Sequence, residues 1–337
     1  MAEDTAGAND AQTSPGPFAG SASDSLSAVG EFAVIDRLLN GRVQPPSVTV
    51  GPGDDAAVIA TSDGRTAVST DMLVERRHFR LDWASPHQIG RKAIAQNAAD
   101  IEAMGARPAA FVVSFGAPSD TPADAAVELS DGMWDEARRC GGGIAGGDLV
   151  RAPLWVISVT VLGDLGGRAP VLRSGARAGD VVAVAGDLGR SAAGYALWAK
   201  GIDEYPELRE RHLVPRPPYG HGVAAADAGA TAMTDVSDGL IADLGHIATA
   251  SGVEIDVATD LLASDHAAVA AAAATVAADA WSLVLGGGED HALVATFPGE
   301  VPDGWRVIGR VRASHAGARV LVDGEKWSGT AGWQSFD

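Results

Sequence analysis

The sequence predicts a two-domain protein of the α/β or α+β class. Its 337 residues suit two domains of ordinary size better than one. Apolar residues make up 46% of the chain, aromatic residues only 5%, and glycines number 42, a composition typical of loop-rich α/β enzymes. Strand-like and helix-like segments alternate in both halves, which favours layers of sheet and helix over a helical bundle.

Composition also divides the chain. Residues 1–28 are rich in Ala, Ser, Gly, Asp and Pro and almost lack large apolar side chains, so they predict a disordered tail. Residues 163–180 are rich in Gly and Arg and predict a domain boundary near residue 165. The expected units are a tail (1–28), an N-terminal domain (29–164) and a C-terminal domain (165–337).

Apolar periodicity and end signals predict the elements of the N-terminal domain. Ser85-Pro86 offers an N-cap and a first helical residue, and Thr121-Pro122 repeats this signal. The expected strands are 56–60, 66–70, 111–115 and 154–162. The expected helices begin near residue 31, span 85–104 and span 121–139.

The C-terminal domain shows the same mixture. The expected strands are 181–185, 253–257 and 292–297, and the expected helices are 191–200, 219–228, 240–249 and an Ala-rich helix that includes 267–278. A turn is expected at 235–239, and a late hairpin is expected to reverse at Asp323-Gly324.

The charge balance and the cysteine count exclude several classes of protein. The formal net charge is −19, which makes nucleic acid and anionic membranes poor partners. The single cysteine, Cys140, excludes an internal disulfide and a cysteine-based metal site. Residues 1–28 lack the pattern of a secretory signal, and the longest apolar stretch, 267–278, is too short to span a bilayer. We therefore expect a soluble protein of the cytoplasm.

Common nucleotide-binding motifs are missing from the sequence. The lysines are Lys92, Lys200 and Lys326, and none follows a glycine, so there is no P-loop. There is also no protein-kinase catalytic loop and no dinucleotide fingerprint. Any handling of phosphate must therefore depend on metal ions rather than on a phosphate-binding lysine.

Aspartates in Gly- or Ser-flanked clusters predict such a metal site. Mg²⁺ prefers hard oxygen ligands and usually needs one or two carboxylates together with substrate phosphates. Any one of these aspartates, taken alone, is more often a helix cap or a turn residue, but five separate clusters make that explanation much weaker for the set. The clusters contain Asp54 and Asp55, Asp71, Asp100, Asp148, and Asp235 with Asp238.

Other candidates for phosphate binding are less specific. Gly141-Gly142-Gly143 and Gly146-Gly147 are able to bring backbone N–H groups close to phosphate, although such runs are more often plain turns. Arg173 suits a bidentate phosphate contact or an ordinary surface position equally well. His78 is more often a structural residue, and Trp333 suits either ring stacking or packing on the core.

No set of nucleophile and general base stands out, and this favours one type of reaction. A hydroxyl acceptor needs a base to take its proton. A phosphate acceptor has a second pKa of roughly 6, so near neutral pH its oxygen is already a nucleophile. The remaining difficulty is repulsion between two polyanions, which Mg²⁺ ions and an arginine relieve.

The ordered motifs resemble those of thiamine-monophosphate kinases. The resemblance runs from about Gly30 to Trp333. The matching segments are Gly53-Asp54-Asp55-Ala56-Ala57-Val58, Ser69-Thr70-Asp71, Asn97-Ala98-Ala99-Asp100, Ala103-Met104-Gly105-Ala106, Gly146-Gly147-Asp148, Arg173-Ser174-Gly175, Asp235-Val236-Ser237-Asp238-Gly239-Leu240 and Gly287-Gly288-Glu289-Asp290.

This resemblance implies a fold and a reaction. The fold is that of aminoimidazole ribonucleotide synthetase, with an N-terminal α/β domain that pairs in a homodimer and a C-terminal α/β domain that closes over the site. The implied reaction is direct transfer of a phosphoryl group from ATP to thiamine monophosphate, which gives thiamine diphosphate. Two features depart from the family pattern: the acidic tail before Gly30, and His291, where some members carry an aromatic residue.

The resemblance also implies roles for individual residues. The implied Mg²⁺ ligands are Asp55, Ser69, Thr70, Asp71, Asp100, Asp148, Asp235 and Asp238. The implied ATP contacts are Gly147, Asp148, Arg173 and Ser237, and the implied thiamine-phosphate contacts are His78, Glu289 and Trp333. Among these, Asp71, Asp148 and Arg173 are expected to act in the chemical step.

Other functions stay open at this point. Selenophosphate synthetase should carry a reactive cysteine or selenocysteine in an N-terminal glycine-rich loop, and Cys140 lies far from there. A hydrogenase-maturation protein should end in a cysteine-bearing tail, whereas this chain ends Ser335-Phe336-Asp337. A relative of the aminoimidazole ribonucleotide cyclo-ligase and a non-catalytic nucleotide- or metal-binding regulator are the remaining alternatives.

Overall fold

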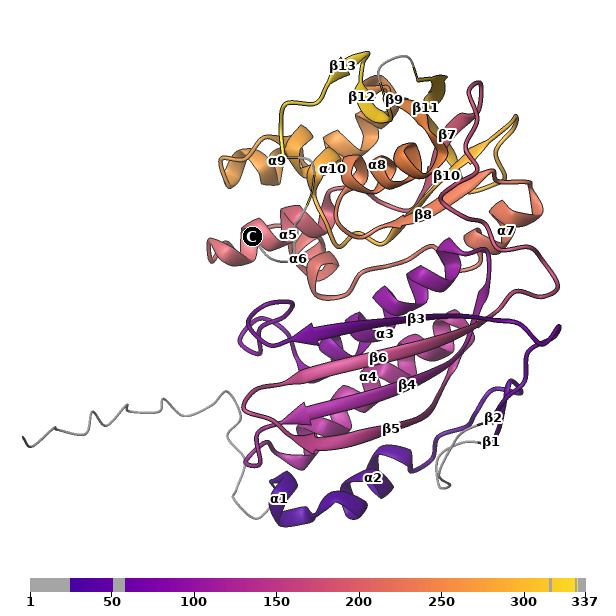
Figure 1. Ribbon diagram of the computed structural model, residues 1–337. Coiled ribbons are helices and arrows are strands. Elements are labelled where there is room, and N and C mark those ends of the chain that lie inside the picture. The colour runs from indigo at the N-terminus through magenta and orange to yellow at the C-terminus, as the bar shows by residue number, and fades with distance from the viewer. Residues whose placement is uncertain (1–24, 51–57, 315–316, 331, 333–337) are drawn as a thin grey trace, which may run out of the picture.

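The computed structural model describes residues 25–50, 58–314, 317–330 and 332. These residues form a four-stranded sheet from the first half of the chain and a seven-stranded sheet from the second half, with a small two-stranded sheet beside the first (Figure 1). No helix in this part of the chain combines the length and apolar character that crossing a membrane requires.

The four-stranded sheet has the order β3-β6-β4-β5, so β3 and β5 are its two edges. β4 runs parallel to β5, whereas β6 is antiparallel to both β3 and β4. Figure 1 shows α3 and α4 behind these strands. The elements of this half are α1 (Leu26–Val29), α2 (Glu31–Leu39), β1 (Val48–Val50), β2 (Val58–Ile59), β3 (Thr66–Val74), α3 (Pro86–Ala103), β4 (Arg107–Ala117), α4 (Ala123–Cys140), β5 (Gly143–Arg151) and β6 (Val156–Asp164).

Alternating burial gives this sheet one covered face and one open face. β6 alternates between buried and half-buried residues along its length, as expected for a strand that is covered on one side. Phe111, Val113 and Phe115 on β4 face the helices and belong to the core. The open face carries exposed apolar side chains at Val68, Met72, Val112 and Val150.

α3 forms where the sequence predicts it, for the predicted reason. Ser85 accepts a hydrogen bond from the Gln88 backbone, the Gln88 side chain accepts one from the Ser85 backbone, and Pro86 opens the helix. Most of α3 is buried because it lies between the four-stranded sheet and the C-terminal half. This central position allows its polar residues to reach both halves.

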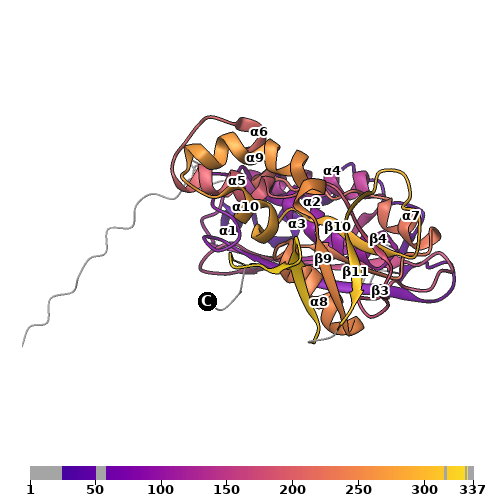
Figure 2. The same cartoon turned by 90° about the horizontal axis from the view of Figure 1, so that it is seen from above.

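The seven-stranded sheet has the order β13-β12-β9-β11-β7-β10-β8 and is covered on both faces. Helices α5, α8, α9 and α10 pack on one face, and α7 with the end of α3 packs on the other. The elements are β7 (Val181–Ala185), α5 (Arg190–Ala199), α6 (Pro206–Leu213), α7 (His221–Asp227), β8 (Ala232–Val236), α8 (Leu240–Ser251), β9 (Val253–Val257), η2 (Thr259–Leu262), α9 (Ala263–Thr275), α10 (Ala280–Gly286), β10 (Ala292–Phe297), β11 (Arg306–Ala313), β12 (Arg319–Val322) and β13 (Glu325–Lys326). Helices α5, α6 and α9 lie together, far from α7 (Figures 1 and 2).

The structure differs from the sequence prediction at several elements. Residues 25–28, expected in the tail, belong to the N-terminal half, because Ser25 caps α1 and the backbone of Leu26 donates to Thr121. The glycine-rich stretch 143–151 is strand β5 rather than a loop. Asp235 lies within β8, so the turn expected at 235–239 begins only after Val236. Helix α6 and strand β11 were not expected.

The two halves meet in an extensive junction. Leu213 and Val214, which end α6, are buried in the core of the N-terminal half. Beside them, the Trp83 and Trp198 rings stack with centroids 5.7 Å apart. The Arg80 guanidinium lies 4.7 Å from the Trp83 centroid, and that of Arg209 lies 3.7 Å from the Trp198 centroid. This stack of two tryptophans and two arginines joins the loop after β3 to α5 and α6.

Candidate active site

The N-terminal half contributes acidic residues that lie between β3 and α3. Ser69 and Asp71 alternate with exposed residues on β3, so both face α3. The Ser69 hydroxyl donates to Asp100 Oδ2 at 2.6 Å, and Asn97 Oδ1 accepts from the Asp71 backbone N–H at 3.2 Å. The Gln96 amide donates to Asp71 Oδ2 at 3.3 Å. These hydrogen bonds hold two carboxylates in defined positions beside the junction.

The C-terminal half brings a second group of acids to the same place. Asp235 lies in β8, which packs against α3, and its Oδ2 is 3.2 Å from His291 Nδ1. Both side chains are buried. Asp238 follows in the turn after β8 and is half-buried. The structure thus brings together Asp71, Asp100 and Asp235, which lie far apart in the sequence.

Electrostatics indicates that these carboxylates are close enough to interact. Burial, with the nearby charges of Asp235 and Asp71, raises the pKa of Asp100 to about 7. Burial and Asp235 also raise the pKa of Asp238. Several carboxylates that are each costly to ionise together form a donor set that a hard divalent cation would stabilise. The residues present therefore fit Mg²⁺.

Two glycine-rich turns lie against each other next to this group. At Gly239, with φ 134°, an added Cβ would be 2.8 Å from the carbonyl oxygen of Gly286, and at Gly288 it would be 2.7 Å from that of Ser237. The Glu289 backbone N–H donates to the Ser237 carbonyl at 2.7 Å. Close contact between the turns therefore places Ser237 and Glu289 side by side.

Glu289 and His291 have positive φ values of 62° and 52°. Non-glycine residues in this region cost of order 1–3 kcal/mol each and persist where the surrounding structure demands them, often at functional sites. Burial lowers the pKa of His291, but its hydrogen bond and charge interaction with Asp235 outweigh this, and the net pKa is raised. His291 therefore serves as a charge partner for the buried Asp235. No role was predicted for His291 from the sequence.

His78 lies in the loop after β3, within the N-terminal half. Its Nδ1 accepts the Val74 backbone N–H at 2.9 Å, and burial lowers its pKa. In the neutral ring the proton is therefore on Nε2. This nitrogen is the one left as a hydrogen-bond donor, for example to a phosphate.

Three predicted residues, Thr70, Gly147 and Asp148, do not join the group within one chain. Thr70 lies on the open face of the sheet, where its hydroxyl donates to the Val159 carbonyl. Asp148 on β5 pairs with Ser114 on β4, so it lies on the open face and three strands away from β3. Gly147 shares this distant edge. Arg173 differs from these three: it is exposed, but its charge partly offsets the rise in the pKa of Asp238, which indicates that the two are neighbours.

Two predicted residues lie outside the part of the chain that the structure describes. Asp55 belongs to the segment 51–57, and Trp333 belongs to the segment 333–337. Their roles stay predictions from the sequence.

Two residues on α8 extend the acidic group. Asp238, Asp243 and His246 have ligand atoms within 4.8 Å of one another. Asp243 accepts from the backbone N–H groups of Asp238 and Gly239 at 3.1 and 3.0 Å, and burial raises its pKa to about 7. This contact shapes the turn that carries Asp238. The signal in the sequence was the spacing of Asp243 and His246, which places them on one face of a helix.

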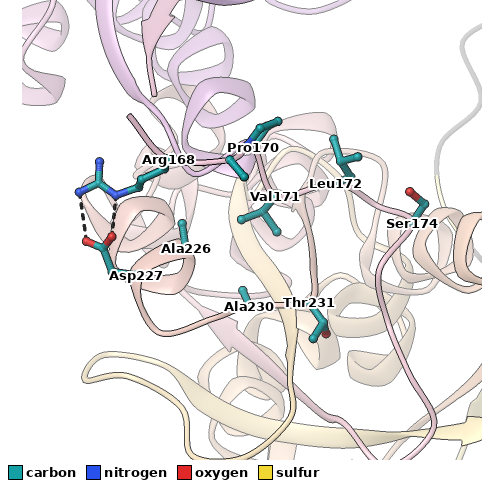
Figure 3. A pocket seen from close by; sticks show the side chains of 10 residues that line it. Arg168, Pro170, Val171, Leu172, Ser174, Ala226, Asp227, Ala230 and Thr231 are labelled. Atoms are coloured by element: carbon teal, nitrogen blue, oxygen red, sulfur yellow. Dashed lines mark hydrogen bonds and ion pairs between the residues drawn. The ribbon is translucent and has the colours of Figure 1, made fainter. Parts of the chain in front are cut away.

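A cavity of about 530 Å³ lies apart from the carboxylates (Figure 3). It is lined by the linker residues 168–172 with Ser174, by α7 and by the residues that precede β8. Arg168 and Asp227 form a double hydrogen bond at one end, as Figure 3 shows. Thr231 lies before β8, whereas Asp235 lies near the other end of that strand. The candidate active site is therefore identified by the converging carboxylates and not by cavity volume.

Two models of a known protein family match this chain, one in each half. Residues 53–165 match the family model "AIR synthase related protein, N-terminal domain", and residues 177–320 match "AIR synthase related protein, C-terminal domain". A thiamine-monophosphate kinase from Mycobacterium tuberculosis is 67% identical over 314 residues, which cover 93% of this chain and 94% of that protein.

Solved structures give the same result. A thiamine-monophosphate kinase from Stenotrophomonas maltophilia superposes with a TM-score of 0.74 at 31% identity, over 87% of this chain and 95% of that chain. A structure described as "AaThiL complexed with AMPPCP and TMP" also has a TM-score of 0.74, at 30% identity, over 91% of this chain and 97% of that one.

Proposed function

This chain belongs to the thiamine-monophosphate kinase family, and on that premise we propose that it transfers the terminal phosphoryl group of ATP to thiamine monophosphate. The products are ADP and thiamine diphosphate. The observation that carries the proposal is the convergence of Asp71 and Asp100 from one half with Asp235 and Asp238 from the other. A phosphoryl transfer between two polyanions needs concentrated positive charge, and this group of carboxylates is suited to hold it.

We propose that Asp71, Asp100, Asp235 and Asp238 hold Mg²⁺, with Asp55 as a further ligand predicted from the sequence. Bound Mg²⁺ would supply charge neutralisation for the phosphates of ATP and of the acceptor. The chain's own residues position these charges. Ser69 fixes Asp100, Asn97 fixes the backbone of Asp71, and His291 fixes Asp235.

The acceptor needs no general base in this scheme. The phosphate of thiamine monophosphate is largely dianionic near neutral pH, so its oxygen attacks directly. We propose that Arg173, whose charge acts on Asp238, neutralises phosphate charge; Ser237 lies in the adjacent turn. We propose that His78 donates from Nε2 to the acceptor, and that Glu289 and Trp333 recognise the cationic thiazolium ring.

We further propose that the active enzyme is a homodimer formed through the open face of the four-stranded sheet. That face carries Val68, Met72, Val112 and Val150, which a second copy would bury. Asp148 and Gly147 lie on the edge opposite to Asp71, so they cannot serve the same group within one chain. In the dimer they would serve the nucleotide of the partner.

Turnover with a panel of acceptors tests the function. We expect Mg²⁺-dependent release of ADP with thiamine monophosphate, and thiamine diphosphate as the second product. Formylglycinamidine ribonucleotide, the substrate of the cyclo-ligase, and unphosphorylated thiamine should give none. ADP release with the cyclo-ligase substrate alone would favour that relative, and nucleotide binding without turnover would favour a regulator.

A further inference from the structure

Lys92 is a buried lysine in the middle of α3, and only 3% of its side chain is exposed. Its ammonium group donates three hydrogen bonds: to the His78 carbonyl at 3.1 Å, to the His212 carbonyl at 3.3 Å and to Glu289 Oε2 at 3.1 Å. An ammonium group has three donors, so all of them are used. A buried charge of this kind persists only when it is fully paired.

The three acceptors belong to three separate segments of the chain. His78 lies in the loop after β3, His212 lies in the last turn of α6, and Glu289 lies in the turn before β10. The carbonyl groups in the last turn of a helix lack partners within that helix, and Lys92 satisfies one of them in α6. One side chain of the N-terminal half therefore fixes two segments of the C-terminal half.

Lys92 also determines how Glu289 is presented. Oε2 of Glu289 is shared between Lys92 and His212 Nδ1, the latter at 3.4 Å. Within the described part of the chain, Oε1 has no hydrogen bond or ion pair, and 35% of the Glu289 side chain is exposed. One carboxylate oxygen is thus anchored while the other is left for a ligand.

The charges around Glu289 also indicate that Lys92 acts on its carboxylate. Burial alone would raise the pKa of Glu289, but nearby positive charge, chiefly the Lys92 ammonium, outweighs burial and lowers it. Burial and Lys92 lower the pKa of His212 to about 4, so this ring is neutral at neutral pH. The ammonium of Lys92 therefore stabilises the ionised form of Glu289.

We propose that Lys92 is a positioning residue for the acceptor substrate: it holds Glu289 oriented and ties it to the loop of His78. This role rests on the proposed function, in which both residues contact thiamine monophosphate. Lys92 itself has no donor left for the substrate, so it acts through Glu289. The acceptor site is thereby assembled from both halves of the molecule.

Steady-state kinetics of Lys92→Met tests this role. We expect the KM for thiamine monophosphate to rise at least about tenfold and the KM for ATP to change less than about threefold, because an unpaired Glu289 loses its orientation. Lys200→Met is the matched control, since Lys200 also donates to a carbonyl, that of Val276, but lies on the far end of α5. It should change neither KM. An equal rise in both constants would overturn the proposal.

A double-mutant cycle separates positioning from a purely structural role. In a Glu289→Gln background, Lys92→Met should add less than about threefold to the KM for thiamine monophosphate. A full additive effect in that background would contradict action through Glu289.

Lys92→Gln tests whether the effect of Lys92→Met comes from loss of the fold. The Gln amide still donates to the carbonyls but carries no charge. It should melt closer to wild type and show the same KM split. Failure of both variants to fold would assign Lys92 to stability alone and overturn the proposal. If the wild-type protein shows no turnover with thiamine monophosphate, the proposed function fails instead. If the wild type is active but the KM for thiamine monophosphate is unchanged in both variants, only the role of Lys92 is refuted.

Discussion

The two sheets of this molecule bury their residues differently. In the seven-stranded sheet, β8 and β10 are buried at every position, because helices cover both faces. In the four-stranded sheet, β3 and β6 alternate, and one face carries exposed valines and a methionine. The C-terminal half therefore covers its sheet within one chain. The N-terminal half has an exposed apolar face, and its Asp148 lies far from Asp71. In the proposed dimer, a second chain would use both. Four predictions test this contrast.

The largest effect is expected from Asp71→Asn. Asn keeps the shape and one acceptor oxygen but removes the charge. We expect kcat/KM to fall at least about a hundredfold, the size of effect seen when an enzyme loses one group that stabilises charge in the transition state. Stability without Mg²⁺ should stay the same or rise, because neighbouring carboxylates repel one another. Asp63→Asn, in the turn before β3, is the control. Near wild-type turnover of Asp71→Asn at limiting Mg²⁺ would remove this residue from the site.

Mixed dimers test whether Asp148 acts on the partner. Asp71→Asn and Asp148→Asn chains should each be nearly inactive alone. When they are co-expressed, half of the dimers would contain both chains, and each of these would have one intact site in two. Activity should therefore recover to about a quarter of wild type. If Asp148 acted within its own chain, every site would carry one defect and no recovery would appear.

A charge on the open face should separate the two chains. Val112→Lys places an ammonium on a central strand of that face, where Val112 is 36% exposed. We expect the dissociation constant of the dimer to rise at least about tenfold, measured by light scattering across a dilution series, because the charge would have to be buried. Leu261→Lys, on the C-terminal half, is 44% exposed and should have no effect. A wild-type protein that is monomeric at micromolar concentration would refute the dimer itself.

The last prediction concerns pH and stability. The pKa of Asp100 is about 7 in the folded chain against an ordinary value of 3.8. The folded state therefore holds this proton more tightly, so stability from this group is complete below pH 4 and is lost as pH rises to 7, by up to about 1.4 kcal/mol per pH unit. Asp100→Asn should flatten the fall in Tm over this window when Mg²⁺ is chelated. An unchanged slope would show that Asp100 is not the group responsible.

The sequence predicted best where local signals were complete. The start of α3 followed from Ser85 and Pro86, and β6 followed from its alternation. β5 was missed because its glycines resemble a loop, although the close approach of β4 requires them: an added Cβ at Gly147 would be 2.0 Å from the Val113 carbonyl oxygen. α6 was missed because its charged surface gives little apolar periodicity.

The candidate site could be predicted only in part. Asp71, Asp100 and Asp235 were selected from their local sequences, but nothing in their spacing shows that they meet, since α3 must first pack against β8. The separation of Asp148 depends on strand order, which the sequence does not reveal. Lys92 had a signal that was overlooked: it lies three residues after Ile89 and one before Ala93, on the apolar face of the helix.

The stacked pair of Trp83 and Trp198 has a consequence for experiment. Two indole rings 5.7 Å apart and tilted by 18° are close enough for their electronic transitions to couple, and each ring is contributed by a different half of the chain. Such coupling produces a circular-dichroism signal that disappears when the rings separate. The protein therefore contains an intrinsic optical probe of the junction, which needs no label and reports whether the halves stay together as each substrate binds.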